Sequence, residues 1–260
     1  MTTTYALRDS ATMVRRSLRH LLRYPSLTLM LIGLPVVLLL LFVYVFGGTL
    51  GAGLGVGGGR TEYLQYLTPG ILLIAVASAA QGTAITVAMD MVEGIVARFR
   101  TMSISRASVL TGHVVGSVVQ SMVCVLAVVG VALLIGFRPS AGPLGWLGAW
   151  GILVLVSVAL TWLSVALGMV SKSVETASNL PMPLTFLPFL SSGFVPTESM
   201  PAGLRWFAEN QPFTPIIETL RGLLTGGPLD SALLAIGWCL AITIASYLWA
   251  RRLYERDPSR

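Results

Sequence analysis

The chain has 260 residues, of which 55% are hydrophobic and 11% charged, with a formal net charge of +6. Soluble domains carry about a quarter charged residues, so this composition excludes an ordinary soluble protein. Several uncharged stretches reach the roughly 20 residues that a helix needs to cross the hydrocarbon core of a bilayer. Because these stretches do not alternate in polarity, we expect membrane helices rather than the strands of a barrel.

The segment 6–24 is predicted to form an amphipathic helix. Leucine, valine and alanine share one face, and basic side chains fan out beside it: Arg8, Arg15, Arg16, Arg19 and Arg23. An arginine-rich face next to a leucine face is typical of a helix that lies in the membrane interface. The alternative is a loose basic tail.

Six transmembrane spans are predicted, at about 27–46, 68–89, 110–136, 146–170, 179–195 and 231–250. The glycine-rich connection 47–59 is expected to be a flexible link and not a helix. Span two carries a stripe of small residues, Ala75, Ala79, Gly82 and Thr86, which lets another helix approach closely. In the same span, Gln81 is expected to bond a neighbouring helix rather than a substrate.

A short polar stretch, 90–106, separates spans two and three. Read as a helix, it places four apolar residues on one stripe: Met91, Ile95, Phe99 and Met102. Asp90 and Glu93 lie at its start and Arg98, Arg100 and Arg106 toward its end, an order that suits the helix dipole. We interpret the stretch as the docking element of a membrane protein that lacks its own motor. The alternative is a solvated loop.

Span five contains three prolines, Pro181, Pro183 and Pro188, each of which removes a backbone hydrogen bond and bends the helix. Broken helices are tolerated where they are buried or line a cavity. The segment is therefore interpreted either as a flexible wall of a translocation path or as a kinked packing helix.

The connection 196–230 is predicted to contain two short helices, at 201–209 and 214–224. Thr214 is the expected N-cap of the second, with Pro215 at its first position, and Gly226 begins the stop signal. Their aromatic content is too apolar for water, so the pair is expected to dip into the bilayer and return.

The basic residues sort between the two sides of the membrane. With both termini in the cytoplasm, 13 of the 17 lie inside: five before span one, three in 90–106, Lys172 and four in the tail. The remaining four, Arg60, Arg138, Arg205 and Arg221, lie outside. This asymmetry follows the positive-inside rule and explains the basic charge without nucleic acid.

The sequence lacks a P-loop, a zinc motif and a nucleophile elbow, and the predicted span interiors hold no Asp, Glu, Lys or Arg. Ion-coupled transporters usually keep an ionisable residue there. We therefore expect no catalytic residue, metal or cofactor on this chain, and expect any transport to draw its energy from a partner at the cytoplasmic surface.

These features resemble the transmembrane subunit of an ABC-2 type ATP-binding-cassette exporter, in particular the daunorubicin/doxorubicin drug-resistance permease group. Glu93-Gly94, Arg98-Phe99-Arg100 and Ile104-Ser105-Arg106 resemble the cytoplasmic coupling segment of that family. The exit from span five and the external pair are similar in the motifs Ser191-Ser192-Gly193-Phe194-Val195-Pro196, Met200-Pro201, Asn210-Gln211-Pro212 and Arg221-Gly222. One departure is Ser103, where relatives commonly have proline.

The resemblance implies an all-α membrane protein with a cytoplasmic connecting helix (1–26), a six-span domain with a re-entrant pair between spans five and six (27–250) and a cytoplasmic tail (251–260). It implies a permease subunit, not an enzyme, in the plasma membrane of a prokaryote. A second permease, as a homodimer or close heterodimer, and two ATPase subunits that bind ATP and Mg²⁺ would complete the complex. The expected cargo is a hydrophobic or amphipathic drug or metabolite; the alternatives are a lipid, glycan or peptide cargo, or a non-transporting scaffold.

The resemblance also assigns candidate site residues in groups. Coupling to the ATPase is expected of Asp90, Glu93, Gly94, Arg98, Phe99, Arg100, Ile104 and Arg106. The candidate translocation path comprises Gln81, Thr86, Pro181, Phe186 and Phe189. The re-entrant pair contributes Pro201, Trp206, Phe213, Glu218 and Arg221.

Overall fold

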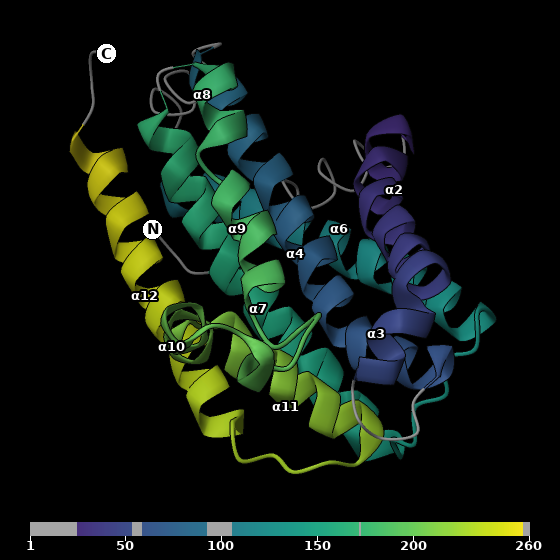
Figure 1. Ribbon diagram of the computed structural model, residues 1–260. Helices are drawn as coiled ribbons and strands as arrows, with labels where there is room; N and C mark the ends of the chain where they lie inside the picture. The colour runs from purple at the N-terminus through teal and green to yellow at the C-terminus, as the bar shows by residue number, and fades with distance from the viewer. Residues whose placement is uncertain (1–24, 54–58, 93–105, 172, 257–260) are drawn as a thin grey trace.

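The structure, a computed structural model, describes residues 25–53, 59–92, 106–171 and 173–256, and within these ranges it contains helices and no strand (Figure 1). The elements in chain order are α2 (Pro25–Leu41), the π-helix η1 (Phe42–Phe46), α3 (Gly47–Gly53), α4 (Arg60–Val92), α6 (Arg106–Leu134), α7 (Pro143–Val170), α8 (Val174–Asn179), α9 (Met182–Phe186), the 3₁₀ turns η2 (Leu187–Leu190) and η3 (Thr197–Ser199), α10 (Ala202–Asn210), α11 (Phe213–Thr225) and α12 (Ala232–Arg256).

In the described part of the chain, five continuous helical stretches are long and apolar enough to cross a membrane, which confirms an all-α membrane protein. They are Leu31–Ala52, Arg60–Val92, Val114–Leu134, Pro143–Val170 and Ala232–Leu253. The predicted fifth span is not one of them, because it is divided into α8, α9 and η2. Prolines at 181, 183 and 188 lack the backbone N–H that would continue the helical ladder.

The central helix of the bundle is α4, which runs between α2 and α7 in Figure 1. It packs against α2, α6, α7, α8, α9 and α11, and 78% of its apolar window is buried. A helix surrounded on all sides is hydrophobic all round, which is why α4 shows no strong amphipathic face. By contrast, α12 buries only 17% of its window and forms one flank of the bundle.

The glycine-rich segment after span one was predicted to be non-helical, and this is wrong for Gly47–Gly53, which forms α3. Tertiary packing on η1 and α4 compensates for the low helix propensity of glycine. A Cβ built on Gly47 would lie 3.3 Å from Cγ of Arg60, so the absence of a side chain allows α3 to lie close to the start of α4. Span two also begins earlier than the predicted residue 68, at Arg60.

The two short helices between spans five and six are confirmed as α10 and α11, but the predicted N-cap of the second is wrong. The helix begins at Phe213 after Pro212, so Thr214 lies inside its first turn. The Thr214 hydroxyl is used elsewhere: it donates to the carbonyl of Ala208 at 2.5 Å and accepts from the N–H of Ser192 at 3.3 Å. The predicted stop is confirmed, because Gly226 ends α11 with a left-handed φ of 72°.

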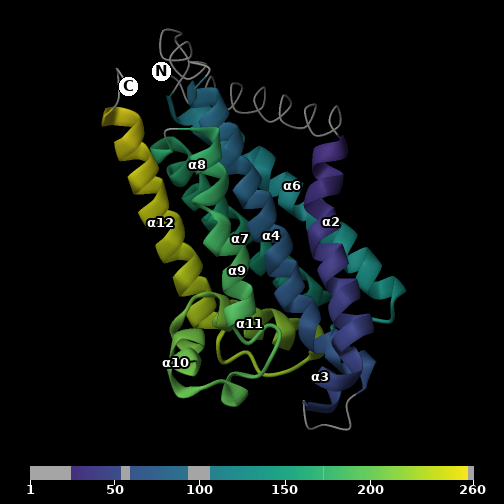
Figure 2. The ribbon, with the colours of Figure 1, turned by 45° about the horizontal axis from the view of Figure 1, so that its top comes forward.

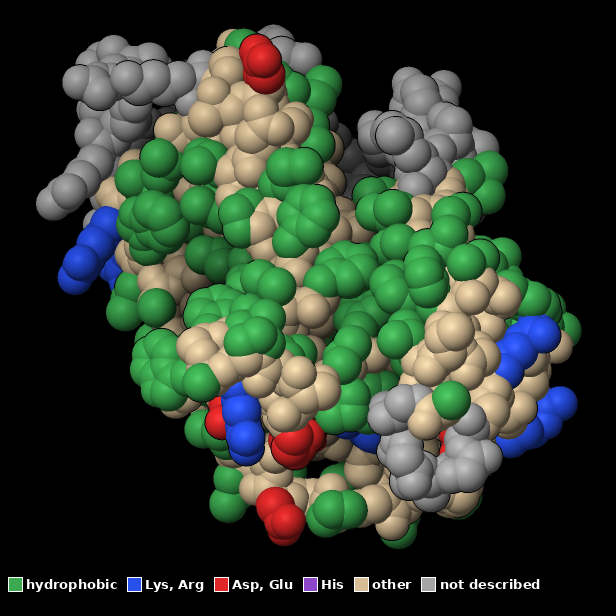
Figure 3. Space-filling view, viewed as in Figure 1, with side chains coloured by type: hydrophobic (Ala, Val, Ile, Leu, Met, Phe, Trp, Pro, Cys, Tyr) green, Lys and Arg blue, Asp and Glu red, His purple; other side chains and the backbone are tan. Residues whose placement is uncertain are grey.

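The chain places α3, α10 and α11 at one end of the bundle and α8 with the last turns of α4 and α12 at the other (Figure 2). Arg60 opens α4 and Arg138 follows α6, both at the end that holds α10 and α11. The four basic residues that the charge count assigns to one side of the membrane therefore lie at one end of the molecule. Between the ends, hydrophobic side chains cover most of the face shown in Figure 3.

Candidate functional site

The predicted coupling segment is described only at its edges. Asp90 lies in the last turn of α4, and Arg106 is the first residue of α6. The other predicted coupling residues lie outside the described residues: Glu93, Gly94, Arg98, Phe99, Arg100 and Ile104. The same holds for the arginines of the predicted interfacial helix, Arg8, Arg15, Arg16, Arg19 and Arg23. Both sets stay predictions.

Gln81 joins the central helix to both halves of span five. Its Nε2 donates to the carbonyl of Ser178 in α8 at 2.8 Å, and its Oε1 accepts from the hydroxyl of Thr185 in α9 at 3.4 Å. The Ser178 carbonyl lies in the last turn of a short helix, where no intrahelical N–H follows to pair with it. Gln81 therefore bonds a neighbouring span, as the sequence indicated, and it does so across the break in that span.

Two other residues of the predicted path have local roles. The exposed Thr86 turns back on its own helix, donating to the carbonyls of Gly82 at 2.8 Å and Thr83 at 3.1 Å. Pro181 is buried and precedes the first residue of α9. The structure does not itself assign either residue to a path.

Five aromatic rings form a continuous row between span one and span five, here called the phenylalanine row: Phe42, Phe46, Phe186, Phe189 and Phe194. Phe189 and Phe194 stack with centroids 4.5 Å apart, and Phe42 lies 4.9 Å from Phe194. Phe42 also contacts Phe46 at 5.7 Å, and Phe189 contacts Phe186 at 6.4 Å. The row runs from buried Phe194 to Phe186, which is 52% exposed.

Only Phe186 and Phe189 of the phenylalanine row were predicted as site residues. Phe42 and Phe46 lie on the π-helix η1, whose wider turn changes the direction of the side chains that follow it. Such turns occur frequently at functional sites. A sequence pattern based on 3.6 residues per turn does not register a local π-turn, and this explains why the two residues were missed.

The turn that follows span five, Ser191–Phe194, is held by side chains from three other segments. Gln211 donates to the carbonyl of Leu190 at 2.7 Å, and the Tyr63 hydroxyl lies 3.4 Å from the carbonyl of Phe194. These bonds pair carbonyls that the interrupted helix leaves without a backbone partner. The turn also touches the central helix directly, since a Cβ on Gly70 would lie 3.1 Å from Cα of Gly193.

Arg221 of α11 is the most heavily engaged of these side chains. Its Nη2 donates to the carbonyl of Ser192 at 2.6 Å, and the guanidinium lies 3.8 Å from the ring centroid of Tyr66. Burial lowers the pKa of Arg221, while Tyr66 and Glu218 raise it. Arginine stays charged at physiological pH, so burying its guanidinium costs free energy. The contacts described above offset that cost. Arg221 thus connects α4, α11 and the Ser191–Phe194 turn.

The other predicted residues of the external pair lie at different depths. Pro201 precedes α10. Trp206 on α10 is 68% exposed, whereas Phe213 at the start of α11 is 2% exposed. Glu218 accepts a hydrogen bond from the Ser231 hydroxyl at 2.7 Å, which ties α11 to the start of α12. Of the two helices, α11 therefore belongs to the packed core and α10 presents its aromatic residue outward.

Hydroxyl groups connect the three most buried spans. The hydroxyls of Thr83 in α4 and Ser117 in α6 are hydrogen-bonded, and Ser117 lies 3.4 Å from the Thr161 hydroxyl in α7. Interhelical hydrogen bonds of this kind help hold helices together where water is absent. They fix α6 and α7 against α4 near the end of the bundle that holds α8.

Comparison with known proteins gives consistent results. The family model of the ABC-2 type transporter matches residues 9–225. A daunorubicin resistance ABC transporter permease protein of Streptomyces coeruleorubidus is 30% identical over 224 residues, which cover 83% of this chain and 77% of the relative. A probable doxorubicin resistance ABC transporter permease protein of Mycobacterium tuberculosis is 24% identical over 189 residues, covering 69% and 68% of the two chains.

Proposed function

Since this chain belongs to the ABC-2 type transporter family, we propose that it exports hydrophobic or amphipathic drugs or metabolites as the permease of an ATP-driven complex. As a member of that family it is a multi-pass membrane permease, and the ATPase is a separate subunit. The observation that carries the proposal is the similarity, over 83% of the chain, to a permease named for daunorubicin resistance.

The proposed attachment site for the ATPase is the stretch 90–106. It joins the end of α4 to the start of α6, so a force applied there acts on the central helix. Two ATPase subunits, which bind ATP and Mg²⁺, and two copies of this chain make up the proposed complex. The basic helix at 1–26 would lie in the membrane interface beside them, ahead of the six-span domain at 27–250.

The proposed orientation is the one given by the charge count, with both termini and the stretch 90–106 in the cytoplasm of a prokaryotic cell. This orientation is supported by the four basic residues that the count assigns to the outside, because all of them lie at the end with α10 and α11: Arg60, Arg138, Arg205 and Arg221. That end is then external, and α10 and α11 form the proposed re-entrant pair.

The contacts of α4 suggest how motion would reach the path. A helix packed on nearly every side moves as a rigid body, and Gln81 transmits its displacement to α8 and α9 through hydrogen bonds. Span five can bend at its prolines, and the phenylalanine row beside it offers apolar, polarizable surface to a flat cargo. On the external side, Arg221 and Gln211 hold the Ser191–Phe194 turn.

The test is reconstitution with the ATPase encoded nearest to this chain. The two are co-expressed, purified through a tag on one of them and placed in liposomes, and ATP-dependent accumulation of rhodamine 6G is followed by fluorescence. We expect a complex with equal numbers of both subunits and transport that stops when a hydrolysis-deficient ATPase replaces the active one. Purification of the chain without any ATPase would contradict the proposal.

A further inference from the structure

The junction of α4, α6 and α7 contains buried hydroxyl groups that the bonds described above do not satisfy. One layer of the junction is bonded, since Ser117 of α6 lies between Thr83 of α4 and Thr161 of α7. One turn away, Ser121 of α6 and Ser157 of α7 are both 0% exposed, and neither Oγ atom has a hydrogen-bond partner among the described residues. A buried hydroxyl without a partner costs free energy, so these two groups require one.

The two unpaired hydroxyls oppose each other across α6 and α7. These helices are joined by the short connection 135–142 and run in opposite directions. Ser121 follows Ser117 by four residues along α6. Ser157 precedes Thr161 by four residues along α7. The 3.4 Å contact between Ser117 and Thr161 therefore sets a register that places the next two hydroxyls opposite each other. Because they do not bond each other directly, a gap separates their Oγ atoms.

The remaining walls of this layer are made of small and apolar side chains. Ala79 and Ala80 precede Thr83 by about one turn on α4, lie on its side of the helix and are both 0% exposed. One turn beyond the layer, Cys124 of α6 and Leu153 of α7 are buried as well. The alanines leave space beside the two hydroxyls, and the burial of the whole layer excludes a large molecule. A partner for the hydroxyls must therefore be small and polar.

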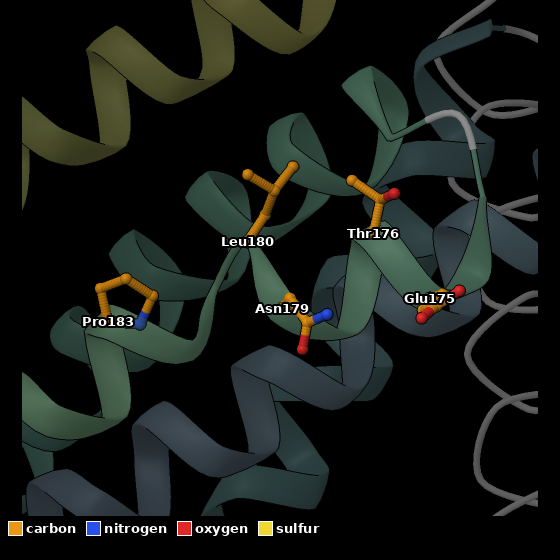
Figure 4. A pocket seen from close by; sticks show the side chains of 5 residues that line it. All are labelled: Glu175, Thr176, Asn179, Leu180 and Pro183. Carbon is orange, nitrogen blue, oxygen red and sulfur yellow. The ribbon is translucent and has the colours of Figure 1, made fainter.

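This layer is separate from the open pocket on span five. That pocket has a volume of about 380 Å³ and is lined by residues of α8, α9 and the turn between them (Figure 4): Glu175, Thr176, Asn179, Leu180 and Pro183. The central helix α4 reaches span five through Gln81, two residues before Thr83. Residues two apart on a helix do not share a face, so α4 lies between span five and the hydroxyl layer.

We propose that an internal water molecule binds between Ser121 and Ser157 and joins α6 to α7 beside the central helix. Buried water molecules make about two to four hydrogen bonds with polar groups that would otherwise be unpaired. The two serines supply two of these bonds, and the Thr161 hydroxyl, one turn from Ser157, retains a lone pair for a third. A bridging water is enthalpically almost as favourable as a direct bond, so the water adds a second polar layer to the junction. The inference does not depend on the proposed function.

A monovalent cation is a poorer occupant of the same layer. The sequences of α6 and α7 contain no acidic residue, and a buried charge without a counter-charge is costly. Both helices are continuous at this depth, so their carbonyl oxygens already accept the hydrogen bonds of the helical ladder. Uncharged hydroxyl oxygens facing a small enclosed space fit a water molecule better.

The first experiment detects the water by X-ray radiolysis of the full chain in lipid nanodiscs. Hydroxyl radicals formed from a bound water oxidise the side chains beside it. The chain offers two free buried thiols for comparison: Cys124, one turn from Ser121 on the same stripe of α6, and Cys239 on α12, 0% and 1% exposed. We expect Cys124 to be oxidised several times faster than Cys239.

The double variant Ser121→Ala/Ser157→Ala is the control for this experiment. Its layer is apolar, and apolar cavities stay dry, so the oxidation rates of Cys124 and Cys239 should become equal. Equal rates in the wild type, or an excess at Cys124 that the double variant retains, would overturn the inference.

Thermal unfolding of the same chain tests whether the water bridges the two serines. A water that needs both hydroxyls is lost with either of them. Ser121→Ala and Ser157→Ala should therefore each lower Tm by about 2–4 °C, and the double variant should lower it no further than either single one. Additive effects, or none, would mean that each serine is satisfied independently, and the bridge would be refuted.

Two controls complete the melting experiment. Ser164 is also 0% exposed and unpaired within the described residues, but the same register places Val114 and not a hydroxyl opposite it. The effect of Ser164→Ala should therefore add to that of Ser121→Ala, and coupling between these two would contradict the inference. Replacement of sodium and potassium salts by N-methylglucamine should leave Tm unchanged, whereas a Tm that depends on the alkali cation would replace the water by a bound cation.

Discussion

Replacement of Arg221 by alanine tests the idea that one side chain holds the turn after span five. The substitution removes a charge-assisted hydrogen bond of 2.6 Å to the carbonyl of Ser192 and a guanidinium–ring contact of 3.8 Å with Tyr66. Such a bond contributes about 1.5–3 kcal/mol and the ring contact about 1 kcal/mol, while relief of the buried charge returns part of this. We expect a net loss of about 2 kcal/mol.

The assay is thermal unfolding of the purified protein in detergent, followed by intrinsic fluorescence. A loss of about 2 kcal/mol corresponds to a fall in Tm of roughly 4–8 °C for a chain of this size class. Arg221→Lys keeps the charge but lacks the planar guanidinium, so its Tm should lie between the Tm of Arg221→Ala and that of the wild type. Arg205→Ala on the neighbouring α10 removes only an exposed pair with Glu209 and should leave Tm unchanged. If Arg221→Ala has the same Tm and transport as Arg205→Ala, Arg221 does not hold the turn.

Three further predictions concern packing, the path and coupling. Gly168→Ala should destabilise the protein by about 1–3 kcal/mol, because its Cβ would lie 2.6 Å from the carbonyl oxygen of Ala84. The control is Gly151→Ala on the same helix, whose Cβ meets open space and which should leave Tm unchanged in the same melting assay. Gln81→Leu removes the bonds to Ser178 and Thr185 and should lower ATP-driven dye transport severalfold while co-purification with the ATPase persists; unchanged transport would show that these bonds do not carry motion. Glu93→Gln or Arg98→Gln should leave membrane insertion intact and reduce the dye transported per ATP hydrolysed, and full coupling in both variants would argue against 90–106 as the docking element.

The sequence predicted most of the spans because each is an uncharged run of sufficient length, a signal that depends on composition alone. It also predicted the break in span five, since Pro181, Pro183 and Pro188 act locally on the backbone. It failed for α3, where packing against α4 outweighs the propensity of a glycine-rich segment. Tertiary packing of this kind produces no periodic pattern in the sequence.

The candidate site was only partly predictable for the same reason. Gln81 was identifiable as an amide inside an apolar span, which must find a partner. Phe42 and Phe194 could not be paired from the sequence, because their ring contact joins residues of different spans through the fold. Thr214 shows the converse error: a residue of the correct type for an N-cap is used for a longer-range bond to Ser192.

The close approach of Gly70 and Gly193 gives span five the geometry of a lever. With backbone against backbone at that point, the end of the segment at Gly193 has little room to translate, and Gly193 would serve as a fulcrum. If α8, α9 and η2 moved together as one rigid arm, the distance from Gly193 to Glu175 would be roughly 27 Å at about 1.5 Å per residue. A tilt of about 10° would therefore move the Glu175 end by about 5 Å, close to one helical turn, while the fulcrum stays in place. A modest rotation would in this way become a large displacement at the end of the bundle that holds α8.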